Sequence, residues 1–388
     1  MIKTIALTVA VLGAASVAQA QAPAPPPAAP TVAAPLAAET SDVATLPPAG
    51  PHRIWISDGF GGGTMIIDGD TGNLMATLDG AVLSDYAASP GQKAIYVAES
   101  IWSKGNRGQR QDMISVYDGT SLKLTSEVAL PGRAYMNPSP QTFAVSSDGG
   151  RGYVYNMQPS SSVIVVDMAK QKVVGSVETP GCALAFPWGA SGFSSLCGDG
   201  SLATVSTAGG KPVLDKSATF FDPEKDPVYE NSPTDPKSGL TLFVTYSGVV
   251  HPVKLGAKPV FETPWTLQEA AGLPPASTEE GSLAWRPGGR TPMALHVASG
   301  KLYVLMHAGE HWTQKKAGDE LWIVDIATHR VIRRAALKDA AAYVAVSQDD
   351  HPQLYLVSKT GLSIRNADTL EELRSVDDMV GIPIVPPL

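Results

Sequence analysis

One pattern of apolar and polar positions recurs along most of this chain. Each copy has a turn, a short apolar run, a loop, a second apolar run ending near an aspartate, and then a further turn and an outer run. The third copy shows the pattern most clearly, with a turn at 146–149 and apolar runs at 152–155 and 163–167. We distinguish seven copies, which cover residues 53–78, 89–118, 146–177, 182–211, 240–261, 301–332 and 353–376.

The spacing of these copies predicts the fold. A period of roughly 40 to 50 residues is typical of the four-stranded blades of β-propellers. Alternation within the runs is only partial, as expected where sheets pack face to face. We therefore predict an all-β, seven-bladed β-propeller. The alternative, a pair of β-sandwiches, would not need a uniform period. The one helix signal is a capping box, Thr266 to Glu269, between the fifth and sixth copies.

The first residues indicate export. Residues 1–20 combine a charged start, an apolar run and a small-residue cleavage site at 18–20, which is typical of a signal peptide. A membrane anchor is the alternative, but the run is shorter than the roughly 20 residues that a bilayer requires. Residues 21–50 are rich in Ala and Pro and predict a flexible arm. The propeller is expected at 51–388, in the periplasm and without membrane insertion.

Net charge and cysteine content limit the classes of partner that the chain can bind and indicate its redox environment. The formal net charge is −8, and no basic stripe offsets it, which disfavours nucleic acid as a partner. The chain has two cysteines, Cys182 and Cys197. In an oxidising compartment one disulfide is the default, and two buried thiols are the alternative. A disulfide closing this loop would stabilise the fold by about 3 kcal/mol in the chain-entropy estimate.

Several short motifs suggest chemistry without establishing it. His307 and His311 have the spacing of metal ligands on a helix, but this stretch leaves a strand for a loop. The glycine-rich residues 59–64 are not followed by the Gly-Lys-Ser/Thr of a phosphate-binding loop, and residues 189–192 lack the spacing of a nucleophile elbow. The basic stretch 104–110 is read as a solvated loop, with a docking patch for an acidic partner as the alternative.

Tryptophans outside the expected strands could form an interface or line a substrate mouth, although core packing explains most tryptophans in such a fold. They are Trp188, Trp265, Trp285 and Trp312. No catalytic triad, carboxylate pair or metal-ligand cluster stands out in the sequence.

Motifs spread over residues 53–376 resemble the heavy subunits of methylamine dehydrogenase and aromatic amine dehydrogenase. Their order and spacing carry the resemblance more than any one of them. The most specific motif is Trp-Arg-Pro-Gly-Gly at 285–289. The others lie at 53–56, 67–69, 107–112, 116–118, 180–182, 197–202, 221–223, 245–248, 294–296, 302–304 and 371–376.

This resemblance implies a heavy subunit in an α2β2 heterotetramer. The partner would be a small light subunit carrying tryptophan tryptophylquinone. This chain itself would bind neither a cofactor nor a metal ion, and it would hold no catalytic residue. The assembly would deaminate a small primary amine to an aldehyde and ammonia, and pass electrons to a blue copper protein of the amicyanin or azurin type. This chain would shape the surroundings of the partner's cofactor and exclude water from them.

Two site assignments follow from the same resemblance. Cys182 and Cys197 match the family's heavy-chain disulfide. Phe60 is the candidate for the aromatic residue that the family places in its substrate funnel, although its loop here is short and glycine-rich. The motifs favour methylamine-type substrates weakly over aromatic amines. A metal-dependent propeller hydrolase and a non-catalytic binding scaffold are the rival classes.

Overall fold

The computed structural model describes residues 45–58, 62–136, 138–209 and 211–387. The chain divides into two units, Met1–Asp42 and Val43–Leu388, and the described residues lie in the second. The expected signal peptide at 1–20 and the arm as far as residue 44 lie outside the described residues. Among the described residues, no helix has both the length and the apolar character needed to cross a membrane.

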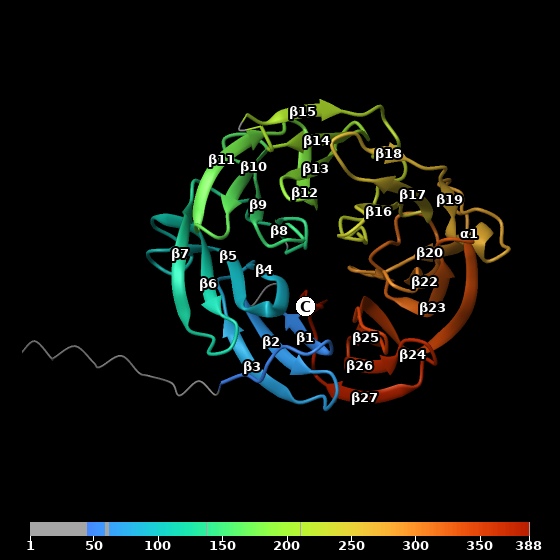
Figure 1. The fold of residues 1–388 in the computed structure, drawn as a ribbon. Helices are drawn as coiled ribbons and strands as arrows, with labels where there is room; N and C mark the ends of the chain where they lie inside the picture. The colour runs from blue at the N-terminus through green and yellow to red at the C-terminus, as the bar shows by residue number, and fades with distance from the viewer. Residues whose placement is uncertain (1–44, 59–61, 137, 210, 388) are drawn as a thin grey trace, which may run out of the picture. The chain divides into compact units, whose positions relative to one another are not determined.

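The second unit is a ring of antiparallel sheets, as Figure 1 shows. Five sheets have four strands and one has eight. The first two four-stranded sheets, each in spatial order, are β28 (Ile382–Ile384), β1 (Arg53–Ser57), β2 (Gly63–Asp68) and β3 (Leu74–Asp79), and then β4 (Asp85–Ala88), β5 (Ala94–Trp102), β6 (Arg110–Asp118) and β7 (Leu124–Leu130). The third and fourth are β8 (Phe143–Val145), β9 (Arg151–Asn156), β10 (Ser162–Asp167) and β11 (Lys172–Glu178), and then β12 (Cys182–Trp188), β13 (Gly192–Cys197), β14 (Leu202–Ser206) and β15 (Val213–Lys216). The fifth has β16 (Leu240–Val244), β17 (Val249–Lys254) and β18 (Val260–Phe261), with β19 (Trp265–Thr266) also paired to β17.

The eight-stranded sheet combines the sixth and seventh copies of the sequence pattern. One long strand, β24, joins them: its residues 330–336 pair with β23, and its residues 341–346 pair with β25. No Gly or Pro interrupts β24, whereas the segment between β7 and β8 contains both. The sheet contains β20 (Ala284–Pro287), β21 (Met293–His296), β22 (Lys301–Gly309), β23 (Gly318–Asp325), β24 (Arg330–Val346), β25 (Gln353–Ser358), β26 (Gly361–Asn366) and β27 (Glu372–Asp377).

The all-β propeller is therefore confirmed, but the expected count of seven blades is wrong. Five four-stranded sheets stand alone, and the last two copies share one sheet. The sequence pattern marks copies through their turns, and a strand that continues without a breaking residue merges two copies into one hydrogen-bonded unit.

The ring is closed by the C-terminal strand. β28 pairs with β1, with Trp55 opposite Ile384 and Ser57 opposite Ile382. The first sheet thus takes its innermost strand from the end of the chain and its other strands from the beginning. Pairing between the two ends of the described chain removes the free edges that an open array of sheets would leave.

The core lies between neighbouring sheets. Tyr96 and Ile114, on one sheet, pack with Phe143 and Ile164 on the next, and all four are buried. β10 is buried at every position, which explains the weak alternation in its sequence. Leu46, at the described end of the arm, also packs into the core and donates its backbone N–H to Thr120 O at 2.8 Å.

The predicted capping box forms as expected. The helix α1 (Leu267–Ala270) begins after Thr266, whose hydroxyl accepts the backbone N–H of Glu269 at 3.1 Å. The one other helical element in the described residues is a single 3-10 turn, Pro90–Gln92.

Candidate functional site

Loops at one end of the ring gather around its central opening, and we call this end the mouth face. In the second sheet, Trp102 of β5 lies opposite Arg110 of β6, and Asp112 lies opposite Leu130 of β7. The loop after β5 and the segment after β7 are therefore on the same end of the ring. The described residues of the mouth face include 62, 80–84, 103–109, 131–136, 138–142, 157–161, 229–231, 245–248, 288–292, 310–317 and 378–382.

A cavity of about 240 Å³ opens on the mouth face. Its lining comes from segments far apart in the sequence, which the ring brings together. The lining residues are Pro138, Ser139, Pro140, Tyr229, Glu230, Asn231, Tyr246, Gly289, Arg290, Thr291, Gln314, Lys315, Tyr343 and Ile382.

Polar groups in this lining are incompletely paired. Asn231 is 9% exposed, and neither its side-chain nitrogen nor its oxygen has a hydrogen-bond partner among the described residues. The side-chain oxygen of Gln314 is also buried without a partner. Tyr229 donates its hydroxyl hydrogen to Pro287 O at 2.8 Å. Buried polar groups normally have hydrogen-bond partners. The side-chain amides of Asn231 and Gln314 are therefore available to bind water or another group in the cavity.

The pKa values of the lining residues depend on burial and on the charges of Glu230 and Lys315. Desolvation raises the pKa of Glu230, and Lys315 opposes that shift. Desolvation also raises the pKa values of Tyr229 and Tyr246, so both phenols stay protonated near neutral pH. The cavity therefore offers phenol, amide and charged groups.

Large apolar side chains are exposed around the mouth. Trp312 is 55% exposed, and its ring lies edge-to-face with Tyr246 at 6.2 Å and 4.5 Å from the ring of His311. Other exposed apolar residues of this face are Val82, Tyr135, Met157 and Val380. A rim of exposed apolar groups on one end of a fold is typical of a contact surface.

The four tryptophans expected outside the strands differ in burial. Trp312 projects from the mouth face as expected for an interface residue, whereas Trp265 lies in the core with 9% exposure. Trp188 and Trp285 are partly buried against core clusters.

Phe60 lies outside the described residues. The described residues on either side lie at the mouth face, because Ser57 at the end of β1 pairs with Thr64 of β2. Tyr86 donates its hydroxyl hydrogen to Gly62 O at 2.7 Å, which holds Gly62 at this face.

His307 and His311 bind protein groups. His307 Nε2 lies 2.8 Å from Thr313 Oγ1, and His311 Nε2 lies 2.6 Å from Lys225 O. Burial, with Lys316 and Arg286 nearby, lowers the pKa of His307 to about 4, against the opposing carboxylate of Asp319. Among the described residues no three His, Cys, Asp or Glu side chains are grouped to hold a metal ion.

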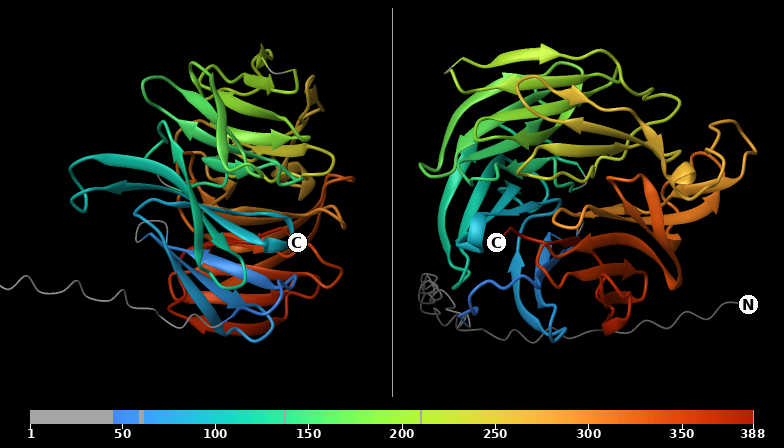
Figure 2. Two further views of the ribbon diagram at one scale, coloured as in Figure 1. Left: turned by 60° about the vertical axis from the view of Figure 1, so that its left-hand side comes forward. Right: turned by 45° about the vertical axis from the view of Figure 1, so that its right-hand side comes forward.

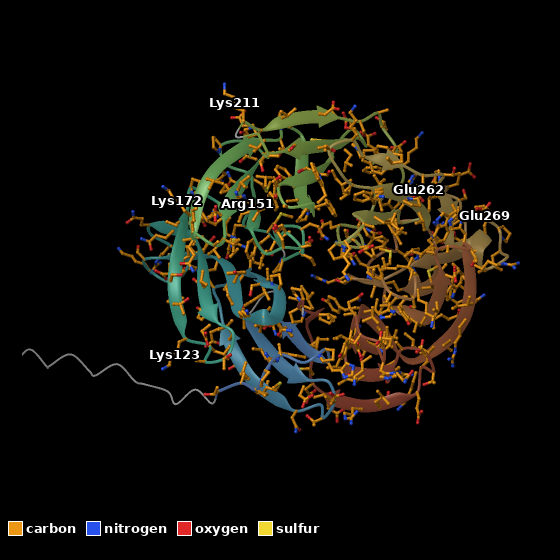
Figure 3. All side chains as sticks on the ribbon, viewed as in Figure 1. Lys123, Arg151, Lys172, Lys211, Glu262 and Glu269 are labelled. Carbon is orange, nitrogen blue, oxygen red and sulfur yellow. A yellow bond between two sulfur atoms is a disulfide. The ribbon has the colours of Figure 1, made fainter. Side chains whose placement is uncertain are left out.

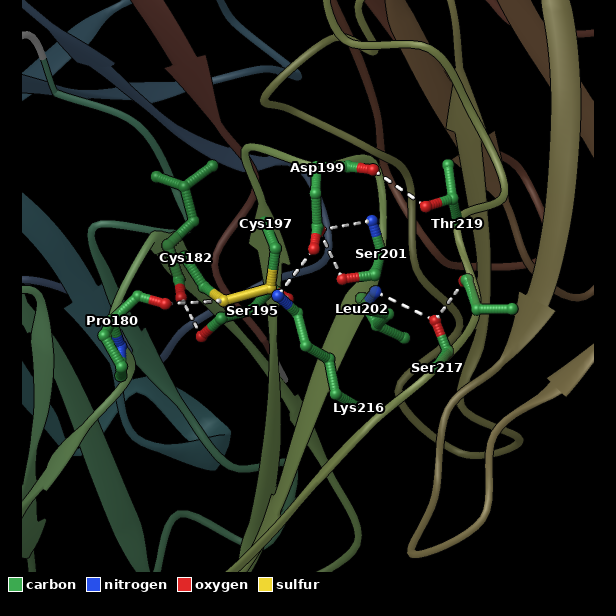
Figure 4. The surroundings of a disulfide bond; sticks show 12 residues. Pro180, Cys182, Ser195, Cys197, Asp199, Ser201, Leu202, Lys216, Ser217 and Thr219 are labelled. Carbon is green, nitrogen blue, oxygen red and sulfur yellow. Dashed lines mark hydrogen bonds and ion pairs between the residues drawn. A yellow bond between two sulfur atoms is a disulfide. The ribbon is translucent and has the colours of Figure 1, made fainter.

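Cys182 and Cys197 form a disulfide between β12 and β13, as Figure 4 shows. The two residues lie directly opposite each other in the strand register, and both are buried. The adjoining turn is held by Asp199, which accepts the hydroxyl hydrogen of Ser201 at 2.5 Å and the ammonium of Lys216 at 2.7 Å. The 189–192 stretch is the hairpin between the same two strands.

No pattern in the sequence marks most of the residues that line the cavity. Asn231, Tyr246 and Gln314 lie in loops or irregular segments, where no periodic pattern marks them. Tyr246 belongs to one of the family-like motifs, at 245–248, and that was the one signal that pointed to it.

Comparison with solved structures supports the fold alone. The chain is similar to the structure titled "Dihydro-heme d1 dehydrogenase NirN in complex with DHE", with 18% identity, a TM-score of 0.55, and coverage of 90% of this chain and 78% of that one. It is also similar to a functionally unknown protein from Desulfotomaculum acetoxidans, with 8% identity, a TM-score of 0.59, and coverage of 87% and 99%.

Sequence comparison is more specific. The methylamine dehydrogenase heavy chain of Methylobacillus flagellatus is 29% identical over 326 residues, which cover 82% of this chain and 79% of the relative. The heavy chain of Methylophilus methylotrophus is 26% identical over 362 residues, which cover 91% and 87%. Residues 59–386 match the family described as methylamine dehydrogenase heavy chain (MADH). This match spans nearly the whole ring, and the chain belongs to the methylamine dehydrogenase heavy chain family.

Proposed function

We propose that this chain is the heavy subunit of a periplasmic amine dehydrogenase that deaminates a primary amine. The family match over residues 59–386 carries the proposal. The net reaction converts an amine and water to an aldehyde and ammonia and releases two electrons and two protons. The electrons would pass to a blue copper protein of the amicyanin or azurin type.

The redox group in this proposal belongs to a light subunit, in an α2β2 assembly. That subunit would carry tryptophan tryptophylquinone, which supplies the electrophilic carbonyl and accepts the two electrons. Export to the periplasm would follow from the signal peptide expected at 1–20. The disulfide between Cys182 and Cys197 agrees with an oxidising compartment.

The mouth face is the surface that we assign to the light subunit. Trp312 and Tyr246 present aromatic edges there, and aromatic residues are enriched in the buried centres of interfaces. A subunit seated over this face would exclude water from the cavity and restrict the path of the amine. Phe60 remains the proposed aromatic residue of the substrate funnel.

Small primary amines such as methylamine are the favoured substrates. The names of the relatives support methylamine. Aromatic amines are the second candidate, because Tyr229, Tyr246 and Tyr343 give the cavity an aromatic lining.

The test begins with native protein from the periplasm. Co-purifying chains are identified by mass, and visible spectra are recorded with and without methylamine and phenylethylamine. A small partner with a quinone band that one amine bleaches supports the proposal and identifies the substrate class. A colourless chain without a partner contradicts it and leaves a binding scaffold.

A variant pair tests the mouth face in the same complex. Trp312→Ala should weaken association with the small partner by about 1 to 3 kcal/mol, the range of an interfacial aromatic anchor. Phe261→Ala is the matched control, because Phe261 is an exposed aromatic residue on the outer strand β18. Equal affinities of the two variants would place the partner elsewhere.

A further inference from the structure

The hairpin of β5 and β6 extends beyond the neighbouring sheets, as Figure 2 shows. Its strands stay paired as far as Trp102 and Arg110, and residues 103–109 at its tip are all exposed. The tip is tied together by backbone bonds, from Lys104 N to Arg107 O at 3.0 Å and from Ser103 N to Gln109 O at 3.0 Å. The hairpin, which we call the arm in this subsection and which is distinct from the N-terminal arm expected at 21–50, is thus a paired and hydrogen-bonded structure as far as its tip.

A stack of side chains braces the base of the arm. Trp102 and Tyr135 meet edge-to-face at 5.0 Å, and the guanidinium of Arg110 lies 5.6 Å from the first ring and 5.7 Å from the second. Arg110 also donates to Asp112 Oδ1 at 2.8 Å and to Arg133 O at 2.7 Å. These contacts hold the arm against the segment after β7 and orient its tip.

The tip carries positive charge that the chain does not neutralise. The side chains of Lys104 and Arg107 make no ion pair with any residue that the structure describes. Arg110, by contrast, is paired with Asp112. On a chain with a net charge of −8, two unpaired cations at a projecting tip form a local positive site.

Two exposed apolar groups lie at the base of the arm. Ile101 is on β5 and Tyr135 contacts Trp102 and Arg110, and each is 42% exposed. The segment after β7 links this patch to the mouth face, because Tyr135 contacts the arm and Pro138 and Pro140 line the mouth cavity. The arm and the mouth cavity therefore both contact the segment after β7.

We propose that the arm captures the light subunit of the proposed complex by pairing Lys104 and Arg107 with carboxylates at the edge of that subunit. This inference rests on the proposed function. Its occupant is a protein with acidic groups beside an apolar patch, since the positive tip favours carboxylates and the exposed Ile101 and Tyr135 favour an apolar counterpart. An anionic polymer would meet the repulsion of the remaining acidic surface.

The test measures the dissociation constant of the complex with the small chain that co-purifies from the periplasm, at 0.05 and 0.5 M NaCl. In Lys104→Ala/Arg107→Ala we expect the dissociation constant to rise roughly tenfold at low salt, mainly through a slower association rate. At high salt the difference from the unaltered protein should shrink to about twofold.

The matched control is Lys123→Ala/Lys172→Ala. Figure 3 places both lysines on the outside of the ring, and the control removes the same charge. Both double variants should keep the melting temperature of the unaltered protein, because all four side chains are exposed.

Three results would overturn the inference: equal affinities of the two double variants, a loss that persists at high salt, or an intact complex that fails only to pass electrons to its acceptor. The last result would assign the arm to the acceptor. Absence of any small partner for the unaltered protein would instead contradict the proposed function, and the inference with it.

Discussion

His307 is buried on β22 with 0% of its surface exposed. Its Nδ1 atom has no hydrogen-bond partner among the described residues and packs against Gly288, where a Cβ atom would lie only 2.2 Å from it. Glycine is therefore required at this position of the Trp-Arg-Pro-Gly-Gly motif. Lys316 and Arg286 add repulsion for a protonated ring. The same histidine that suggested a metal ligand in the sequence is thus held neutral by its surroundings.

This environment predicts acid sensitivity. The pKa of His307 is about 4 in the folded chain, below the value of about 6.5 for an unfolded histidine. As pH falls from 6.5 to 4, the unfolded chain takes up the proton first, so the free energy of unfolding should decrease by about 3 kcal/mol.

Urea unfolding of His307→Gln at several pH values checks this expectation. The variant should lose that part of the pH dependence, and His351→Gln, which alters an exposed histidine, should keep it. Parallel pH profiles for the unaltered protein and His307→Gln would contradict the lowered pKa.

At the scale of single elements, the disulfide joins the two inner strands of one sheet. β12 and β13 are paired from Cys182 opposite Cys197 to Trp188 opposite Gly192. The crosslink has a sequence separation of 15 residues, so its main effect is to limit the freedom of the unfolded chain.

Removal of the crosslink should therefore destabilise the propeller without changing its fold. Cys182→Ala/Cys197→Ala is expected to lose about 3 kcal/mol of unfolding free energy. Circular dichroism should stay the same at room temperature while the urea midpoint falls. Reduction of the unaltered protein should give a similar loss, and an unchanged midpoint in both experiments would show that the crosslink does not stabilise the fold.

At the scale of the whole molecule, stability depends on closure of the ring. β28 contributes three residue pairs to the first sheet, and Val385 packs beside Ile54 and Ile56. Without β28, the inner edge of β1 would be left unpaired and its apolar side chains would face water.

Truncation after Asp378 should open the ring. We expect a melting temperature at least 10 °C lower than that of the full chain, or aggregation on expression, together with faster proteolysis, since both packing and strand pairing are lost. Truncation after Pro386 is the control, because it leaves β28 intact. Similar melting curves for the two truncations would show that closure does not depend on β28.

Features that arise from neighbouring residues could be predicted from the sequence. Apolar runs bounded by turn residues predicted the strands, the motif Thr266 to Glu269 predicted a capped helix, and the cysteine pair predicted a crosslink. Each of these rests on local backbone preference, on spacing or on redox compartment, all of which can be read along the chain.

Contacts between distant parts of the chain depend on the tertiary structure. It merged the last two copies through β24, closed the ring with β28, and brought Asn231, Tyr246 and Lys315 into one cavity. These residues lie in loops whose positions depend on the path of the whole ring, so no local pattern encodes their approach. The physical reason is that strand formation follows local preference, whereas the mouth face exists only after the sheets have packed and the ring has closed.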